Sequence, residues 1–303
     1  MKKIFMMLTA LLVMGLNSVR AAEQDLLVST NNTTLQLFAV KGEPLKFAYY
    51  GPRLNEQQAS DLWVAGDAMN RKAYPTFNDW CPDECAIMVK HANGQMMLNL
   101  VVESVERTAT NGGELFTIKT KDKVQPFYAN ICYRTYQQAD VIETWVELTN
   151  REKKDVVLMQ YASAYLPVRS AEAWLSHQHG QWGNECNITE EPLTPGMKVI
   201  SNRDGGRNSQ LDHPEVMLSL DGRPTETSGR VIGAALCWSG NYKLRIATDA
   251  YDTHLRHLIA GIDETAADYR LRPGQTLRTP ELALTFSTAG KGGVSRNMHR
   301  WAR

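Results

Sequence analysis

The sequence carries no excess of either charge. Its 303 residues include 33 Lys and Arg and 33 Asp and Glu, so the formal net charge at pH 7 is zero. Proteins that bind nucleic acid or an anionic membrane surface concentrate basic residues, and this composition gives no sign of such an excess. We therefore expect no nucleic-acid partner and no attachment to a membrane surface.

Long apolar runs are also missing beyond the N-terminus. No segment after residue 22 stays apolar for the roughly 18 residues that a membrane-spanning helix needs. Internal repeats and low-complexity linkers are absent as well. The length therefore predicts one large domain or two smaller ones, with no transmembrane helix in the mature chain.

The N-terminus has the pattern of a secretory signal peptide. Two lysines precede an apolar stretch at residues 4–16, which is too short to span a bilayer comfortably. Small residues follow at Ala21 and Ala22, where a signal peptidase cuts. We expect residues 1–22 to be removed and the protein to be exported, to the periplasm or outside the cell. The alternative is a retained anchor, although no cysteine follows the cleavage region to carry a lipid.

Sustained helical periodicity is missing before residue 290. Apolar and polar residues alternate instead, as in Leu35, Leu37 and Ala39, and turn signals recur roughly every 8 to 15 residues. This pattern predicts an antiparallel all-β sandwich over residues 23–289. The Asn93-Gly94 pair predicts a hairpin between the strands on either side of it. Residues 55–70 are polar and fit a short helix or a loop.

The last residues change character. Residues 290–293 are rich in glycine and predict a break in the chain. The stretch that follows, with Met298 and Trp301 three residues apart, has helical spacing. We therefore expect residues 290–303 to form the start of a helix.

The chain has five cysteines, an odd number: Cys81, Cys85, Cys132, Cys186 and Cys237. An exported protein meets an oxidising compartment, so disulfides are an option, and Cys81 and Cys85 are close enough in sequence to close a small loop. At least one thiol then stays free or pairs elsewhere. Cys132 and Cys237 fall in strand-like runs, and we expect both to be small buried hydrophobes.

One tryptophan lies between two glycines, in Gly180-Gln181-Trp182-Gly183. Glycine lets the backbone turn sharply or approach a neighbouring strand closely. A large flat ring presented on such a turn suits a sugar, whose CH-rich face stacks on aromatic side chains. The competing interpretation is a core tryptophan beside a turn, because tryptophan is usually well buried.

A series of short motifs runs in a fixed order through the chain. Its members are Tyr49–Leu54, Tyr74–Phe77, Gly180–Glu185, Glu191–Gly196, Trp238–Asn241, Gly261–Ile262, Leu271–Gln275 and Thr279–Glu281. In this order and spacing they resemble the N-terminal domain of glycoside hydrolase family 36, the α-galactosidases. The resemblance covers nearly all of the mature chain, and its specificity comes from the ordered set.

The resemblance implies a fold and a division of roles. The family's N-terminal domain is a large β-supersandwich of the galactose mutarotase-like type, followed by a linker helix and a (β/α)8 barrel. The barrel carries two catalytic aspartates in a retaining mechanism on terminal α-galactosides. The Ser295-x-x-x-His299 pattern resembles the passage into the linker helix, so the barrel would lie beyond these residues. We expect no catalytic residue, metal or cofactor in this chain.

Carried over residue by residue, the family's central tryptophan is Trp182, which would bind substrate by reaching toward the barrel's sugar pocket. Some members also offer an aspartate from this domain to a neighbouring subunit, which implies a homo-oligomer as one assembly. The corresponding loop at residues 55–70 is shorter here, and Asp61 is not assigned that role. The sequence departs from the family pattern at Leu211–Glu215 and Asn78–Pro82. The residues at the rim of the pocket are therefore not assigned.

Other polar residues have simpler interpretations. His177 and His179 are two apart and share one face of a strand, which is a spacing that binds zinc. No third ligand is evident, so we expect surface histidines. The carboxylates of Glu190, Glu191, Asp204 and Asp212 are expected to be solvated loop residues.

Two functional hypotheses follow. In the first, the chain is the N-terminal part of an exported α-galactosidase, without the catalytic domain. In the second, it is a free-standing β-sandwich that binds galactosides or assembles with another protein, with Trp182, Trp80 and Trp63 as candidate platforms. The reading frame downstream of Arg303 discriminates between them.

Overall fold

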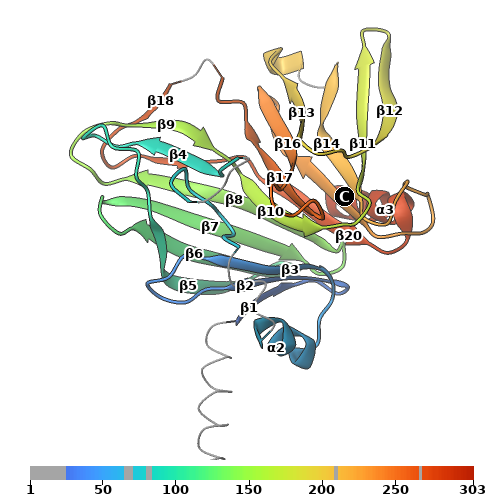
Figure 1. Cartoon of the computed structure of the whole chain (residues 1–303), viewed down its shortest axis with the longest axis horizontal. Helices are drawn as coiled ribbons and strands as arrows, with labels where there is room; N and C mark the ends of the chain where they lie inside the picture. The colour runs from blue at the N-terminus through green and yellow to red at the C-terminus, as the bar shows by residue number, and fades with distance from the viewer. Residues whose placement is uncertain (1–24, 65–70, 80–83, 208–210, 266–267) are drawn as a thin grey trace, which may run out of the picture.

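The computed structural model describes residues 25–64, 71–79, 84–207, 211–265 and 268–303. The predicted signal peptide, Trp80 and Cys81 lie outside these ranges. Within them strands dominate, and every pairing between named strands is antiparallel (Figure 1). The predicted all-β sandwich is confirmed.

The largest sheet has ten strands in the order β12-β11-β14-β15-β20-β8-β7-β6-β5, with β19 paired to β8. Its strands are β5 (Leu100–Thr110), β6 (Gly113–Asp122), β7 (Phe127–Tyr136), β8 (Val141–Asn150), β11 (Trp174–Gln181), β12 (Asn184–Pro192), β14 (Asp212–Ser219), β15 (Val231–Leu236), β19 (Thr276–Arg278) and β20 (Leu282–Ser287). The strand β12 forms one edge of this sheet, so one of its two sides has no strand partner in the described chain.

Three smaller sheets complete the architecture. Their orders are β1-β2-β3, β10-β17-β16-β13 and β18-β9-β4. The strands are β1 (Asp25–Ser29), β2 (Thr33–Phe38), β3 (Lys46–Pro52), β4 (Ile87–Lys90), β9 (Val156–Tyr161), β10 (Ala164–Arg169), β13 (Met197–Asn202), β16 (Tyr242–Thr248), β17 (Leu255–Ile262) and β18 (Tyr269–Leu271). One continuous apolar core joins side chains from all four sheets, including Leu35, Ile232, Leu244 and Leu158.

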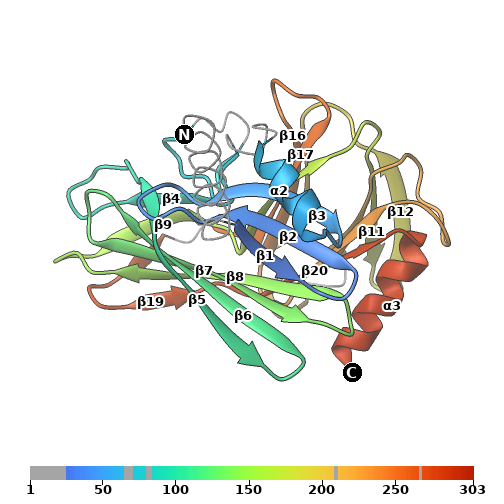
Figure 2. The same ribbon diagram turned by 90° about the horizontal axis from the view of Figure 1, so that it is seen from below.

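The strand β2 is buried along its whole length, whereas its alternating sequence predicts a half-buried strand. It is the central strand of its sheet, and helix α2 (Glu56–Val64) covers it. The buried Gln36 side chain donates to the carbonyl of Ala59 in that helix at 2.9 Å. Figure 2 shows α2 and the β1-β2-β3 sheet as a layer against β5 to β8.

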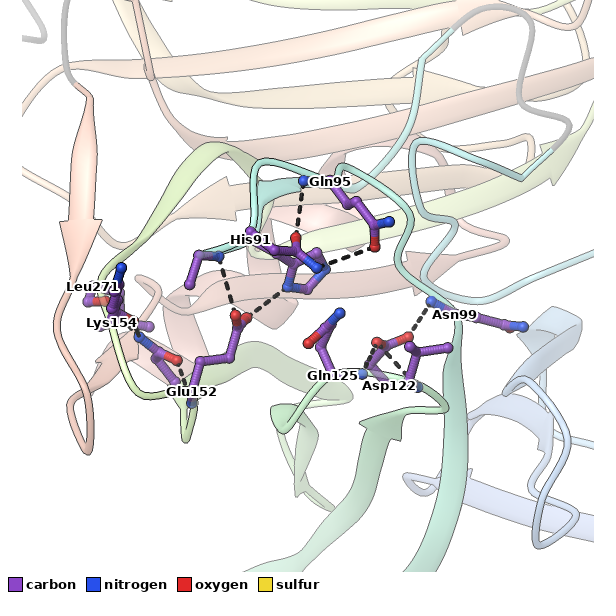
Figure 3. Close-up of polar contacts among 12 residues, drawn as sticks. His91, Gln95, Asn99, Asp122, Gln125, Glu152, Lys154 and Leu271 are labelled. Atoms are coloured by element: carbon purple, nitrogen blue, oxygen red, sulfur yellow. Dashed lines mark hydrogen bonds and ion pairs between the residues drawn. The ribbon is translucent and has the colours of Figure 1, made fainter.

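The hairpin predicted at Asn93-Gly94 is wrong. A turn is present, with Gly94 at a φ of 84°, but β4 before it pairs with β9 and β5 after it pairs with β6. The turn therefore carries the chain from one sheet to another (Figure 3). A buried pair between His91 and Glu152, 2.7 Å apart, holds this crossing in place.

The predicted terminal helix is present as α3 (Gly290–Ala302). Its glycines, which we expected to break the chain, form its first turn instead. A Cβ atom at Gly292 would lie 2.9 Å from the carbonyl oxygen of Glu226, so glycine serves close packing there. A short 3-10 turn, η2 (Gly205–Arg207), is the remaining helical segment of the described residues. None of the described helices is both long and apolar enough to cross a bilayer.

Candidate functional site

Trp182 lies at the tip of the hairpin formed by β11 and β12, which projects from the body of the molecule (Figure 1). Its side chain is 85% exposed. The interpretation of Trp182 as a core residue is therefore excluded. The hairpin presents a bare indole ring to the surroundings.

The two glycines that flank this tryptophan have different tasks. Gly183 has a φ of 77°, a conformation that closes the two-residue turn and that other residues rarely adopt. A Cβ atom at Gly180 would lie 2.7 Å from both the Asn184 oxygen and the Glu185 Cα, so Gly180 allows the two strands to approach. The Gly183 N–H donates to Glu185 Oε1 at 2.9 Å. These constraints fix the turn that carries Trp182.

A polar cluster lies at the base of the hairpin. The Nδ1 atom of His179 is 3.0 Å from Asp212 Oδ1, which links β11 to β14. The Lys198 ammonium of β13 lies 2.6 Å from Glu191 of β12. Its hydrogen bond is the main reason why the pKa of Glu191 is lowered. The hairpin is thus tied both to its own sheet and to the β10-β17-β16-β13 sheet.

His177 is not the surface residue that its sequence suggests. Its side chain is only 8% exposed, with Nε2 3.5 Å from Glu191 and Nδ1 4.0 Å from Asp212. The neighbouring His179 is exposed, as expected. In the described part of the chain, no group of three or more His, Cys, Asp and Glu side chains is placed to hold a metal ion.

The carboxylates near the hairpin were expected in solvated loops, which is wrong for three of them. Glu190 and Glu191 belong to β12 and Asp212 belongs to β14. Each lies beside a basic side chain: Lys291, Lys198 and His179, respectively. A general acid needs a carboxyl with a raised pKa, whereas the hydrogen bond from Lys198 lowers the pKa of Glu191. Glu191 is therefore better suited to binding than to general-acid chemistry.

A groove of about 390 Å³ runs beside the hairpin, between α3 and the outer face of the large sheet. Its lining combines apolar and polar side chains from both elements, including Gln178, Met217, Val294, Met298 and His299. Ile188 of β12 forms its rim and is 66% exposed. An ion pair between Lys291 and Glu190 joins the start of α3 to the hairpin at one end.

The described cysteines are free thiols with different surroundings. Cys132 is buried in β7, as predicted, and burial raises its pKa to about 12. Cys237 follows β15 and is exposed, so the expectation of a buried residue is wrong. Cys85 is buried. Cys186 is exposed on β12, and its Sγ lies 3.5 Å from His213 Nε2.

Comparison with known proteins explains the motif series. The glycosyl hydrolase family 36 N-terminal domain matches residues 43–272, which is most of the chain. The chain belongs to this family. The matched range includes Trp182 and the whole β11–β12 hairpin, and it ends before α3.

Relatives and solved structures agree with the family. The chain is 25% identical over 228 residues to alpha-galactosidase 2 of Pediococcus pentosaceus, covering 71% of this chain and 31% of that protein. It is 27% identical over 313 residues to the bifunctional alpha-galactosidase/sucrose kinase AgaSK of Mediterraneibacter gnavus, covering 91% and 33%. The crystal structure of the alpha-galactosidase from Lactobacillus brevis superposes with a TM-score of 0.82 at 22% identity, covering 91% of this chain and 41% of that one. The chain thus spans about a third of the length of these curated relatives.

Sequence reasoning missed the groove and the tie between the two sheets. Both depend on side chains that are far apart in sequence, such as Gln178 with His299 and Glu191 with Lys198. The i, i+2 histidine spacing was the one available signal for the cluster. Two candidate platforms are not tested, because Trp80 lies outside the described residues and the side chain of Trp63 is not described.

Proposed function

We propose that this chain is the N-terminal domain of an exported α-galactosidase, in which it supports a catalytic barrel and lends Trp182 to the sugar pocket. The observation that carries the proposal is the family match over residues 43–272. The named relatives are α-galactosidases that are about three times longer than the matched part. Terminal α-galactosides are therefore the substrate class, and the chemistry belongs to a part of the protein beyond this chain.

The geometry of the hairpin supports the role of Trp182. An indole ring that is 85% exposed on a tight turn can stack on the apolar face of a galactose ring without rearrangement of the core. The carboxylates of Glu191 and Glu190 form ion pairs with Lys198 and Lys291, so we do not assign them to a catalytic pair. The domain supplies contact area, and a barrel supplies the nucleophile and the acid/base.

Export is supported by the basic and apolar pattern of residues 1–22. The product would be periplasmic or secreted. Mass spectrometry of the N-terminus after expression in a bacterial host tests this, and cleavage near Ala22 is expected. An intact N-terminus in the exported fraction would contradict the assignment.

The experiment compares α-galactoside hydrolysis by two samples. One is the chain alone, and the other is the chain together with a catalytic barrel from the same gene. We expect no hydrolysis of a chromogenic α-galactoside by the chain alone, and hydrolysis when the barrel is present. In that complex Trp182→Ala is expected to raise KM by about 3- to 10-fold, the value of one stacking contact. Trp238→Ala, on a different turn, is the control and is expected to leave KM unchanged. Turnover by the chain alone that is lost on mutating its own residues would overturn the proposal.

A free-standing carbohydrate-binding or assembly module is the alternative, and an indole ring that is 85% exposed is also compatible with a sugar platform on this domain. Titration of the chain alone with galactose, followed by tryptophan fluorescence, separates the two. A saturable signal that is lost in Trp182→Ala supports the module. A silent titration supports the domain of a larger enzyme.

A further inference from the structure

Cys186 lies on β12, four residues after Trp182, and is exposed. Its backbone has a φ of 62°, in the left-handed region that residues other than glycine rarely adopt. Its Sγ atom is 3.5 Å from Nε2 of His213 in β14, the strand on the other side of β11. An accessible sulfur beside an imidazole is the setting in which cysteine acts as a nucleophile, because the ring nitrogen can take the thiol proton.

The other described cysteines lack this setting. Cys85 and Cys132 are buried, and desolvation raises their pKa values to about 11 and about 12. Cys237 is exposed, but desolvation of its sulfur and the nearby carboxylates of Glu143 and Glu281 raise its pKa to about 11. These three remain protonated at neutral pH. Cys237 is thus a matched control: an exposed thiol whose sulfur bonds a backbone carbonyl, 3.9 Å away on Ala235.

Charged groups around the pair are engaged elsewhere. The Glu185 carboxylate accepts the Gly183 N–H at 2.9 Å. Asp212, next to His213, is 3.0 Å from His179. Glu215 follows two residues after His213 and is exposed to solvent. The His213 imidazole, with Nε2 3.5 Å from the sulfur, is the hydrogen-bonding partner of Cys186.

We propose that Cys186 and His213 form a thiol-exchange site at which a low-molecular-weight disulfide modifies the hairpin. His213 Nε2 takes the thiol proton, and the Cys186 sulfur attacks one sulfur of the disulfide RS–SR. A bond forms between Sγ and that sulfur, the RS–SR bond breaks, and RS⁻ leaves with the electron pair. The leaving thiolate then takes a proton from the imidazolium. One disulfide is consumed for each disulfide made, so no other oxidant is needed.

The position of the site gives the modification a consequence. The group R becomes attached to the exposed strand that carries the Trp182 turn, within four residues of the indole ring. The odd number of cysteines in the chain already requires at least one thiol without an internal partner. The inference goes beyond the proposed function and does not depend on it, because the exchange needs neither a sugar nor a barrel.

The test uses the full reduced chain at neutral pH, treated with 5,5′-dithiobis(2-nitrobenzoate) and, separately, with oxidised glutathione. The rate is followed by absorbance or intact mass, and the modified residue is identified by peptide mapping. Wild type, Cys186→Ser, His213→Gln and Cys237→Ser are compared. We expect Cys186 to be labelled before Cys237, the fast phase to vanish in Cys186→Ser and to persist in Cys237→Ser. In His213→Gln we expect a rate lower by about fivefold or more.

Two outcomes would overturn the proposal. The first is labelling of Cys237 at least as fast as Cys186 in the wild-type chain, a comparison that requires no variant. The second is an unchanged rate at Cys186 in His213→Gln with the fold intact by near-ultraviolet circular dichroism. Denaturation removes the difference between thiols, so equal rates in guanidinium chloride serve as the reference.

Discussion

At the scale of single residues, burial decides what an ion pair contributes to stability. Glu152 pairs with His91 at 2.7 Å, and their side chains are 6% and 0% exposed. The other oxygen of Glu152 accepts the Ala92 N–H at 3.0 Å (Figure 3). Glu106 pairs with Lys119 at 2.5 Å, but both side chains are largely solvated. Only the first pair leaves a buried polar group without a partner when the carboxylate is removed.

We therefore expect Glu152→Ala to lower the free energy of unfolding by about 2 kcal/mol, because His91 Nδ1 and the Ala92 N–H would lose their hydrogen-bond partner. The control Glu106→Ala is expected to lower it by less than about 1 kcal/mol. Urea denaturation followed by far-ultraviolet circular dichroism measures both. Similar losses in the two variants would show that the turn between β4 and β5 is held by something other than this pair.

Residue patterns predicted which side chains share a face but not what covers that face. The spacing of His177 and His179 predicted a shared side of a strand, and both Nδ1 atoms lie within 4.0 Å of Asp212 Oδ1, despite a register shift between the two residues. It could not show that His177 lies between carboxylates of two neighbouring strands while His179 remains in solvent. The same limit applies to Trp182, whose flanking glycines predicted the turn but left its exposure undecided.

At the scale of elements, α3 packs on the large sheet at Gly233, where the absence of a side chain leaves room for the helix. A Cβ atom at Gly233 of β15 would lie 2.4 Å from Val294 Cγ1 of α3. Added atoms in a well-packed interface force shifts that cost about 1 to 3 kcal/mol. Gly233→Ala is therefore expected to lower the unfolding free energy by that amount.

A double-mutant cycle with Val294→Ala supplies the control for Gly233→Ala. Val294→Ala removes the methyl groups that meet the new Cβ, so the double variant should lose less than the sum of the two single losses. Thermal or chemical denaturation of all four proteins measures the coupling. Strictly additive losses would mean that α3 does not dock at Gly233 as the structure has it.

The error at Asn93-Gly94 also belongs to this scale. An Asn-Gly turn between two apolar runs predicts a hairpin from local chemistry alone. Here β4 finds its partner in β9, about 70 residues later, and β5 pairs forward with β6. Turn residues determine where the chain reverses, whereas strand partners depend on which sheets the rest of the chain assembles.

At the scale of the whole molecule, composition and periodicity were enough to predict the class of fold but not its division into four sheets. Pairings such as β10 with β17 join residues more than 80 positions apart, which no local pattern encodes. The ordered motifs supplied what periodicity could not, because the family match carries the fold with it. The same holds for the candidate site. A family motif predicted Trp182 as a site residue, whereas the groove was found only in the structure.

Several exposed apolar side chains lie on or beside the strands from β11 to β14. They include Trp182 at 85%, Ile188 at 66% and Met197 at 47% exposure. Apolar patches of this kind mark surfaces that meet a partner. In the proposed enzyme that partner is the remainder of the protein or a neighbouring subunit, and the chain on its own leaves the surface uncovered.

We therefore expect the isolated chain to self-associate, with an apparent mass that rises with concentration in size-exclusion chromatography with light scattering. Replacing Trp182 and Ile188 together by serine should shift the population toward a single chain, because both side chains belong to this surface. Val124→Ser is the matched control, since Val124 is 78% exposed in the turn between β6 and β7 and should leave the association unchanged. A wild-type chain that stays monomeric at every concentration would place the contact surface elsewhere.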